Sequence, residues 1–272
     1  MLCLPVKYKA NYMAHKNFEK LAFVASSRPN AKEALEELVS IYGNVAPEDA
    51  DAIIPLGGDG FMLETFRRYL PLVTSGLPVY GMNKGTIGFL MNKYNPDNLT
   101  KRLRHATISA VHPLSMKAEA AGGTFEDIAF NEVSVFRQSQ QAAHIKISVD
   151  GKVRLNRLIA DGIMLSTPVG STAYNLSAHG PVIPLGADIL ALTPISAFRP
   201  RRWRGALLSG HAKVRFDVLD PNKRPVSASA DNSEIQDLIS IEISQDENTT
   251  LTMLFDENHG LAEKILQEQF AT

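Results

Sequence analysis

The chain has 272 residues, of which 44% are hydrophobic and 21% charged, so it is long enough for one large domain or two smaller ones. Its formal net charge of −1 gives no global reason to expect nucleic acid or an anionic membrane as a partner. Its only cysteine, Cys3, excludes a disulfide within the chain and fits a reduced, cytoplasmic setting.

The first residues predict a loose N-terminal tail over 1–20. This segment contains lysines and only short apolar pieces, which makes it too polar for the apolar region of a signal peptide. No later stretch is apolar for long enough to span a membrane, so we expect no membrane partner.

The first half of the chain alternates between strand-like and helix-like patterns. In order, we expect a strand at 21–26, a helix at 31–42, a strand at 52–56, a helix to about 70 and a strand at 77–82. This β-α-β-α-β rhythm predicts an α/β domain over 21–105 with a parallel, doubly wound sheet.

A glycine-rich turn, Gly57-Gly58-Asp59-Gly60, joins the second strand to the following helix. A strand, glycine loop and helix in this order can place bare backbone N–H groups against a phosphate. Asp59 would repel that phosphate, so it needs another role, such as holding a metal, holding a sugar hydroxyl or capping the helix. The alternative is an ordinary turn before a helix.

A second glycine-bearing stretch, residues 83–90, follows the third strand. Ligands of doubly wound sheets bind beyond the carboxyl ends of the strands, and both glycine stretches lie at such ends. Two such loops at one sheet edge favour a ligand site there.

From about residue 106 the helical periodicity gives way to short alternating strands. These are expected at 108–111, 115–120, 128–136, 143–149, 152–155, 211–219, 226–230, 240–244 and 251–255. They predict a mainly antiparallel β domain over 106–255, in which Asp150-Gly151 marks a two-residue hairpin. Residues 256–272 are expected to form a C-terminal helix that could return to the first domain.

One stretch of the β domain, residues 161–177, differs from a plain strand. An apolar run leads into small hydroxyl residues, and then Tyr174 follows. Small residues admit a flat ring, hydroxyls supply hydrogen bonds, and an aromatic side chain can stack, so a nucleotide base fits this chemistry. The alternative is a serine- and threonine-rich turn at the start of a helix.

Four motifs carry a family resemblance: Gly57-Gly58-Asp59-Gly60, residues 85–90, Phe130-Asn131-Glu132-Val133, and the run from Asp161 to Tyr174. In this order they closely resemble the bacterial-type ATP-NAD kinase family, within the diacylglycerol-kinase-like and phosphofructokinase-like superfamily. The Gly-Gly-Asp-Gly motif is shared with lipid kinases, whereas the last motif is much more specific. The family's fold, an α/β domain followed by a β-rich domain, matches the organisation predicted above.

The resemblance implies ATP-dependent phosphorylation of the 2′-hydroxyl on the adenosine ribose of NAD, which gives NADP. Asp59 matches the catalytic aspartate, acting as base and orienter of that hydroxyl. Phosphates would lie against the loop formed by Gly57, Gly58 and Gly60. An ordinary aspartate is a weak base for an alcohol, so positioning is expected to do much of the work.

The resemblance also implies an NAD-binding set. Its members are Asp59, Gly60, Phe89, Asn131, Glu132, Asp161, Val169, Thr172, Ala173, Tyr174, Asn175, Leu176 and Ser177. The Asn131 amide suits an adenine edge, and the Glu132 carboxylate suits a ribose diol. Without the family, Glu132 would be interpreted as an exposed strand residue and Phe89 as a core aromatic. Asp231 is a further candidate, near the phosphates.

The implied substrates are NAD and ATP, and relatives form homodimers or homotetramers. No cluster in the sequence indicates a dedicated metal site, so Mg²⁺ is expected to arrive with ATP. Ile159 and Ala160, which precede Asp161, depart from common family residues and leave the choice between NAD and NADH open. The basic run at 199–204 could meet phosphates, form a subunit interface around Trp203 or be a solvated loop.

Two alternative functions remain at this point. A lipid kinase could share the glycine loop, although the nucleoside-like segment around Tyr174 disfavours it. A catalytically silent NAD(P)-binding regulator could share the fold, although Asp59 and Glu132 are both present.

Overall fold

The computed structural model describes residues 17–85, 88–184, 186–257 and 263. The chain divides into two compact units, one formed by residues 1–111 with 248–272 and the other by 112–247. The predicted tail (1–20) and terminal helix (256–272) fall almost entirely outside the described residues. Within the described end of the tail, Phe18 is buried in the core of the first unit. The folded chain therefore extends to at least Phe18.

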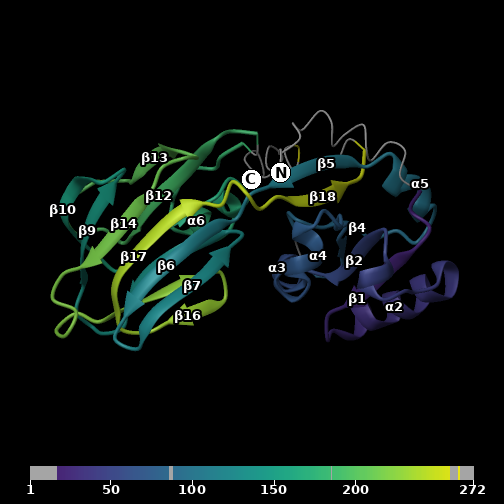
Figure 1. The fold of residues 1–272 in the computed structure, drawn as a ribbon, viewed down its shortest axis with the longest axis horizontal. Coiled ribbons are helices and arrows are strands. Elements are labelled where there is room, and N and C mark those ends of the chain that lie inside the picture. Colours follow the sequence, from purple (N-terminus) through teal and green to yellow (C-terminus); the bar gives the residue numbers. More distant parts are fainter. Residues whose placement is uncertain (1–16, 86–87, 185, 258–262, 264–272) are drawn as a thin grey trace. The chain divides into compact units, whose positions relative to one another are not determined.

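The first unit contains the predicted parallel, doubly wound sheet (Figure 1). Its strands lie in the order β1 (Leu21–Ala25), β2 (Ala52–Gly57), β3 (Met82–Asn83) and β4 (Asn92–Lys93). The helices of this unit are α2 (Pro29–Tyr42), α3 (Asp59–Arg68), α4 (Leu70–Thr74) and α5 (Leu99–Arg104), with a short 3-10 turn at Pro47–Asp49. Strand β2 carries no polar side chain and is buried along its whole length, as expected for a central parallel strand.

The third strand is shorter than the sequence predicts, because the segment before it pairs only at Val79. This residue bridges Ile53 on one side and Met253 on the other. Its N–H donates to Thr252 O at 2.9 Å, and its carbonyl oxygen accepts from Leu254 N–H at 2.9 Å. The last described strand, β18 (Leu251–Phe255), therefore joins the first unit.

This position of β18 differs from the predicted division, in which 106–255 formed one β domain. β18 pairs with β5 (Thr107–Val111), and both lie in the first unit. All five residues of β18 are buried, which is typical of a strand covered on both faces rather than an alternating sandwich strand. A tyrosine and an arginine hold the end of this strand: Asp256 accepts from Tyr80 Oη at 2.6 Å and from Arg102 Nη2 at 2.7 Å.

The second unit is a sandwich of two six-stranded antiparallel sheets (Figure 1). The first sheet has the order β10 (Lys152–Ala160), β9 (Ala143–Val149), β14 (Val214–Val218), β17 (Leu238–Gln245), β6 (Leu114–Ala120) and β7 (Gly123–Ala129). The second has the order β13 (Ala206–Ser209), β12 (Ile189–Ile195), β11 (Gly162–Ser166), β8 (Glu132–Arg137), β15 (Val226–Ala230) and β16 (Ser233–Ile235). The hairpin predicted at Asp150-Gly151 is confirmed, since both residues have positive φ, 52° and 72°.

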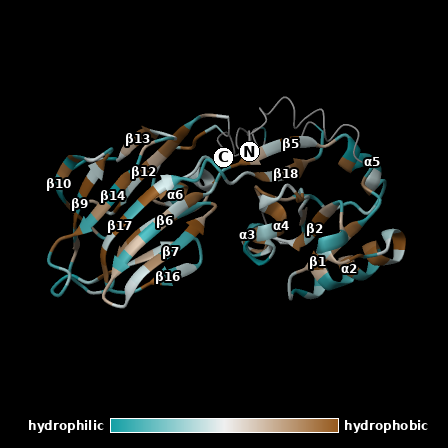
Figure 2. Ribbon diagram, viewed as in Figure 1, coloured by the Kyte–Doolittle hydropathy of each residue, from teal (hydrophilic) through white to brown (hydrophobic). Residues whose placement is uncertain are grey.

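Alternation along the strands separates the core of the sandwich from its outer faces. Burial alternates along β6 from Leu114 to Ala120, and Figure 2 shows the matching alternation of hydropathy. In the second sheet, Val133 and Val135 of β8 lie in the core with Ile163 and Leu165 of β11. The residues that alternate with them along these strands therefore point to the opposite face of that sheet. Glu132, which is predicted to bind NAD, is one of these residues.

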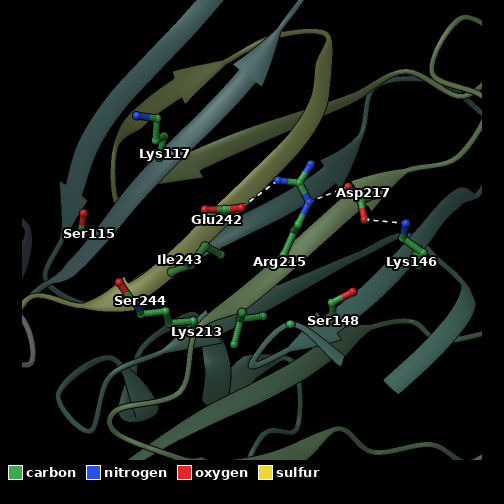
Figure 3. A pocket seen from close by; sticks show the side chains of 12 residues that line it. Ser115, Lys117, Lys146, Ser148, Lys213, Arg215, Asp217, Glu242, Ile243 and Ser244 are labelled. Carbon is green, nitrogen blue, oxygen red and sulfur yellow. Dashed lines mark hydrogen bonds and ion pairs between the residues drawn. The ribbon is translucent and has the colours of Figure 1, made fainter. Parts of the chain in front are cut away.

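The outer face of the first sheet carries a ladder of alternating charges beside a groove of about 630 Å³ (Figure 3). Arg215 Nη1 lies 2.8 Å from Glu242 Oε1, and Arg215 Nε lies 2.8 Å from Asp217 Oδ1. Lys146 Nζ lies 2.9 Å from the other oxygen of Asp217. Opposite charges on neighbouring strands stabilise the pairing modestly and keep this face hydrated. No described helix is both long and apolar enough to cross a membrane.

Because β18 lies in the first unit, its buried apolar side chains should stabilise that unit. Leu254 is 2% exposed and packs in the core of that unit. We expect Leu254→Ala to lower the free energy of unfolding by about 2–5 kcal/mol, because it leaves a cavity. Thermal and urea unfolding followed by circular dichroism would measure the loss.

The matched control is Ile239→Ala, which truncates a strand residue that is 46% exposed. It should change the free energy of unfolding by about 0.5 kcal/mol or less. Equal effects of the two substitutions would contradict the burial of β18.

Candidate functional site

The glycine loop of the first unit packs tightly against the helix that follows it. β2 ends at Gly57, and α3 begins at Asp59 with Gly58 as its N-cap. A Cβ atom on Gly57 would lie 2.7 Å from Cβ of Phe61, so a side chain there would collide with the first turn of α3. Gly60 has open space around it. The start of this ten-residue helix, with its outward-directed N–H groups, therefore lies directly beyond the end of β2.

Asp59 connects the two predicted glycine stretches. Its Oδ2 accepts from the backbone N–H of Phe89 at 2.8 Å, and its Oδ1 accepts from Leu90 N–H at 3.0 Å. The N-cap position of α3 belongs to Gly58, so Asp59 does not occupy the capping position that was one of the three roles considered from the sequence. The carboxylate instead fixes the second loop beside the first.

Close backbone approach explains the glycines of both loops. A Cβ atom on Gly88 would lie 3.1 Å from Asp59 Oδ1, and one on Gly85 would lie 3.3 Å from the Gly58 Cα atom. Gly85 N–H donates to Asn83 Oδ1 at 2.8 Å, which turns the chain after β3. The predicted meeting of two glycine stretches is thus found in the structure. Residues 86 and 87 of the second motif lie outside the described residues.

The Asn131-Glu132 pair lies at the start of β8, where Asp231 holds the backbone. Asp231 Oδ2 accepts from Phe130 N–H at 2.8 Å, and its Oδ1 accepts from Asn131 N–H at 2.9 Å. In return, Asp231 N–H donates to Glu132 O at 3.2 Å. Asp231 itself has a positive φ of 49°, which an aspartate tolerates better than most residues. The turn between β15 and β16 therefore sets the position of Asn131 and Glu132, which are predicted to bind the adenine and the ribose.

The hydroxyl-rich loop after β11 is bonded to the backbone of Phe130 and Asn131, just before β8. Thr167 N–H donates to Asn131 O at 2.9 Å, and its Oγ1 donates to Phe130 O at 2.8 Å. Thr167 Oγ1 also accepts from Gly170 N–H at 3.0 Å. A Cβ atom on Gly170 would lie 2.1 Å from Asn131 O, so only glycine fits there. Two motifs that are separate in the sequence thus form one structure.

Three ionisable groups, Glu132, Asp161 and Tyr174, are close enough for their charges to interact. Burial, and then the charge of Asp231, raises the pKa of Glu132 to about 8. Burial raises the pKa of Tyr174 as well, with smaller contributions from the charges of Glu132 and Asp161. Asp161 pairs with Arg137, whose Nε lies 2.5 Å from Asp161 Oδ1. Since charges act at short range, Glu132, Asp161 and Tyr174 face a common region.

The segment around Tyr174 presents alternate side chains to solvent and to the interior. Tyr174 is 41% and Leu176 is 38% exposed, whereas Asn175 is fully buried. The Asn175 amide donates to Ser171 O at 3.1 Å and Pro181 O at 2.9 Å, and its oxygen accepts from Thr193 Oγ1 at 2.6 Å. The structure gives Asn175 an internal role, because its polar atoms anchor the short helix α6 (Tyr174–Ser177) to β12.

The other residues of this segment that are predicted to bind NAD are likewise divided between buried and accessible side chains. Val169 and Thr172 are buried, and Thr172 Oγ1 donates to Val169 O at 3.3 Å within the 3-10 turn Gly170–Thr172. Ala173 is half-buried and Ser177 is exposed. The accessible side chains of the segment are therefore those of Ala173, Tyr174, Leu176 and Ser177.

Arg137 and Ser166 are not among the site residues predicted from the sequence, and Asp231 was expected only near the phosphates. Arg137 lies on β8 and meets Asp161 across the sheet, a contact that no local pattern reveals. The sequence could have indicated Ser166, because Gly162, Met164 and Ser166 alternate with core residues of β11. They therefore lie on the same face of the sheet as Glu132. The described residues contain no group of three or more His, Cys, Asp or Glu side chains that could hold a metal ion.

Two family models match most of the chain. The ATP-NAD kinase N-terminal domain matches residues 6–108, and the ATP-NAD kinase C-terminal domain matches residues 130–250. The NAD kinase of Caulobacter vibrioides is 54% identical over 253 residues, which cover 93% of this chain and 96% of that protein. The NAD kinase of Rhizobium meliloti is 50% identical over 260 residues, covering 95% of this chain and 100% of that protein.

Two solved structures share the fold. The yeast NADH kinase in complex with NADH has a TM-score of 0.79 at 20% identity, covering 95% of this chain and 89% of that chain. The NAD kinase from Archaeoglobus fulgidus in complex with ATP has a TM-score of 0.71 at 24% identity, covering 92% and 98%. At these identities the similarity establishes the fold alone, and it agrees with the predicted α/β domain followed by a β-rich domain.

The raised pKa of Glu132 predicts a pH-dependent stability. In the unfolded chain this carboxyl group loses its proton near the ordinary value of 4.5, whereas the folded protein keeps it up to about pH 8. The folded state therefore binds more protons between these values, and the stability of the wild type falls as pH rises through this window. Glu132→Gln cannot ionise. Its stability relative to wild type should improve by roughly 3–4 kcal/mol between pH 4.5 and 7.5.

Urea unfolding of both proteins without NAD at these two pH values would measure this change. The comparison uses a difference between pH values, so any cost of burying the new amide cancels. A stability difference that does not change with pH would contradict the assignment.

The internal role of Asn175 predicts that its removal damages folding. Asn175→Ala should lower the melting temperature markedly, because it removes the partner of the buried Thr193 hydroxyl and of the Ser171 and Pro181 carbonyl oxygens. Ser177→Ala, two residues away and exposed, should leave the melting temperature nearly unchanged. Differential scanning fluorimetry would compare them, and an Asn175→Ala protein as stable as wild type would contradict the role assigned here.

Proposed function

The chain belongs to the ATP-NAD kinase family, and on that premise we propose which of its residues carry out the phosphorylation of NAD. The enzyme transfers a phosphoryl group from ATP to the 2′-hydroxyl on the adenosine ribose of NAD, which forms NADP. Family membership favours this activity over the lipid-kinase and silent-regulator alternatives.

The proposal depends most on one observation, the Asp59 carboxylate bonded to Phe89 and Leu90 N–H. Two donors from one loop fix the orientation of this carboxylate relative to the start of α3. An oriented carboxylate can accept a hydrogen bond from a ribose hydroxyl and direct that oxygen at a phosphate. Asp59 therefore acts as base and orienter of the 2′-hydroxyl.

The reaction itself needs positioning and charge stabilisation more than covalent chemistry. The 2′-oxygen attacks the γ-phosphorus, the bond from that phosphorus to the bridging oxygen of ADP breaks, and the hydroxyl proton passes to Asp59. Backbone N–H groups of the loop containing Gly57, Gly58 and Gly60 stabilise the phosphate oxygens.

NAD binding is assigned to the outer face of the second sheet of the second unit. The Asn131 amide recognises the adenine edge, the Glu132 carboxylate binds a ribose diol, and Tyr174 stacks on a ring. Asp161 contributes with Arg137 as its partner. In the first unit, Gly60 offers its backbone and Phe89 its side chain.

We expect a magnesium ion to arrive with ATP. The described residues contain no cluster of three metal-ligating side chains, so the ATP phosphates and water would supply most of its ligands. When bound, the ion neutralises phosphate charge. The expected homodimer or homotetramer and the cytoplasmic location remain predictions from the sequence.

Substitution of the catalytic carboxylate tests the proposal. Asp59→Asn should lower kcat for NADP formation by about 10²–10⁴-fold, because the amide cannot accept the hydroxyl proton. The Kd for NAD, measured by calorimetry, should change little, since the proposed contacts of Asn131, Glu132 and Tyr174 with NAD are left in place. Enzyme-coupled detection of NADP would give the rate.

Glu64→Gln is the matched control, because Glu64 is exposed on the same helix and the substitution has the same chemistry. It should keep wild-type kinetics, and circular dichroism should show both variants folded. An Asp59→Asn enzyme with wild-type kcat would refute the role of Asp59.

A further inference from the structure

Glu132 and Ser166 form a cross-strand pair on the proposed NAD-binding face. They lie directly opposite each other in the antiparallel pairing of β8 and β11. The next pair along, Asn131 and Thr167, is joined by the bond from Thr167 N–H to Asn131 O. Hydrogen-bonded and non-hydrogen-bonded pairs alternate, so Glu132 and Ser166 form a non-hydrogen-bonded pair, in which side chains lie closest.

Each of these side chains has a buried oxygen atom without a hydrogen-bond partner among the described residues. These atoms are Oε2 of Glu132 and Oγ of Ser166, which is 0% exposed. Buried polar atoms without partners are rare and costly in folded proteins. Two of them in one cross-strand pair indicate that a bond is completed only in another state of the site.

The surroundings of Glu132 oppose a negative charge. Asp231 faces it from the turn between β15 and β16, and Tyr174 faces it from α6. On β11 its cross-strand neighbour is the neutral Ser166. Among the described residues no basic side chain forms an ion pair with Glu132, and Arg137, at the far end of the same strand, is paired with Asp161.

We propose that Glu132 is a neutral carboxylic acid in the NAD-free enzyme at neutral pH, that NAD binding releases its proton to solvent, and that Ser166 is a positioning residue whose hydroxyl then donates to Oε2. The proposal rests on the proposed function, because NAD is the ligand that it requires. Burial and Asp231 raise the pKa of Glu132 to about 8, which agrees with the geometry.

The chemistry of the ligand explains why the proton leaves. A ribose diol offers two O–H donors, and a carboxylate accepts such bonds more strongly than a neutral acid does. With the diol and Ser166 all donating, the charged form becomes favoured in the complex. NAD binding and proton release are then linked, so NAD affinity should rise by up to about tenfold per pH unit over the range in which Glu132 is ionised only in the complex, from roughly pH 6 to pH 8, and level off on either side.

Calorimetry with NAD alone measures the released proton directly, because no turnover occurs without ATP. Titrations at pH 7 in PIPES and in imidazole, which differ in ionisation enthalpy, give the number of protons released. We expect about one proton for the wild type and none for Glu132→Gln. Release of no proton by a wild type that binds NAD would overturn this inference and leave the proposed function standing. Failure of the wild type to bind NAD would overturn both.

Ser166→Ala tests the positioning role through its pH profile. The hydroxyl acts only on the ionised carboxylate, so NAD affinity should match the wild type near pH 5 and be about tenfold weaker at pH 8. Stability should not fall, because the removed hydroxyl has no partner among the described residues of the NAD-free protein. A loss of affinity that is equal at both pH values, or no loss at either, would contradict the role of Ser166.

Ser134→Ala is the matched control. Ser134 lies on the same strand and the same face as Glu132, one position farther along that face, where it pairs with Met164. Its removal should leave both the NAD affinity and the proton release unchanged at each pH value. A pH-dependent loss equal to that of Ser166→Ala would overturn the assignment to Ser166.

Discussion

In each unit, one aspartate carboxylate gathers backbone N–H groups from a segment far away in the sequence. Asp59 accepts from Phe89 and Leu90, about thirty residues later, and Asp231 accepts from Phe130 and Asn131, about a hundred residues earlier. Loops with exposed polar backbone do not hold a position by themselves. A carboxylate that accepts two N–H donors provides strong, directional bonds that fix such a loop. In each unit, the predicted site residues near the aspartate depend on these bonds for their position.

These bonds bring backbone segments so close together that glycines or other small residues are required where they meet. Because Asp59 holds the second loop close, Gly88 has little room for a larger residue beside the carboxylate. Because Thr167 and Asp231 hold the turn before β8, the Gly170 backbone lies against Asn131 O. The glycines therefore serve two purposes, since they allow the loops to meet and leave backbone accessible to a ligand.

Much of this could be predicted from the sequence. The alternation of strands and helices indicated the doubly wound sheet, Asp150-Gly151 indicated a hairpin, and the four ordered motifs indicated the family. Long-range pairings could not be predicted. Nothing local indicates that Val79 bonds to Thr252, although the nearly continuous apolar run of β18 is a hint of a central strand.

The candidate site shows the same limit at the level of single side chains. The motif containing Tyr174 was found, but α6 has only four residues, too few for periodicity to tell that Asn175 points inward. Arg137 and Asp161 meet only because β8 and β11 are neighbours. Sequence patterns therefore identified which segments form the site, whereas the roles of individual side chains required the fold.

Amide hydrogen exchange, resolved by residue in NAD-free protein, tests the central claim that two carboxylates fix these loops. In Asp59→Asn, exchange should accelerate at Phe89 and Leu90 and stay unchanged at Phe130 and Asn131. In Asp231→Asn, the pattern should be reversed. Exchange rates at these four amides that match the wild type in both variants would contradict the account.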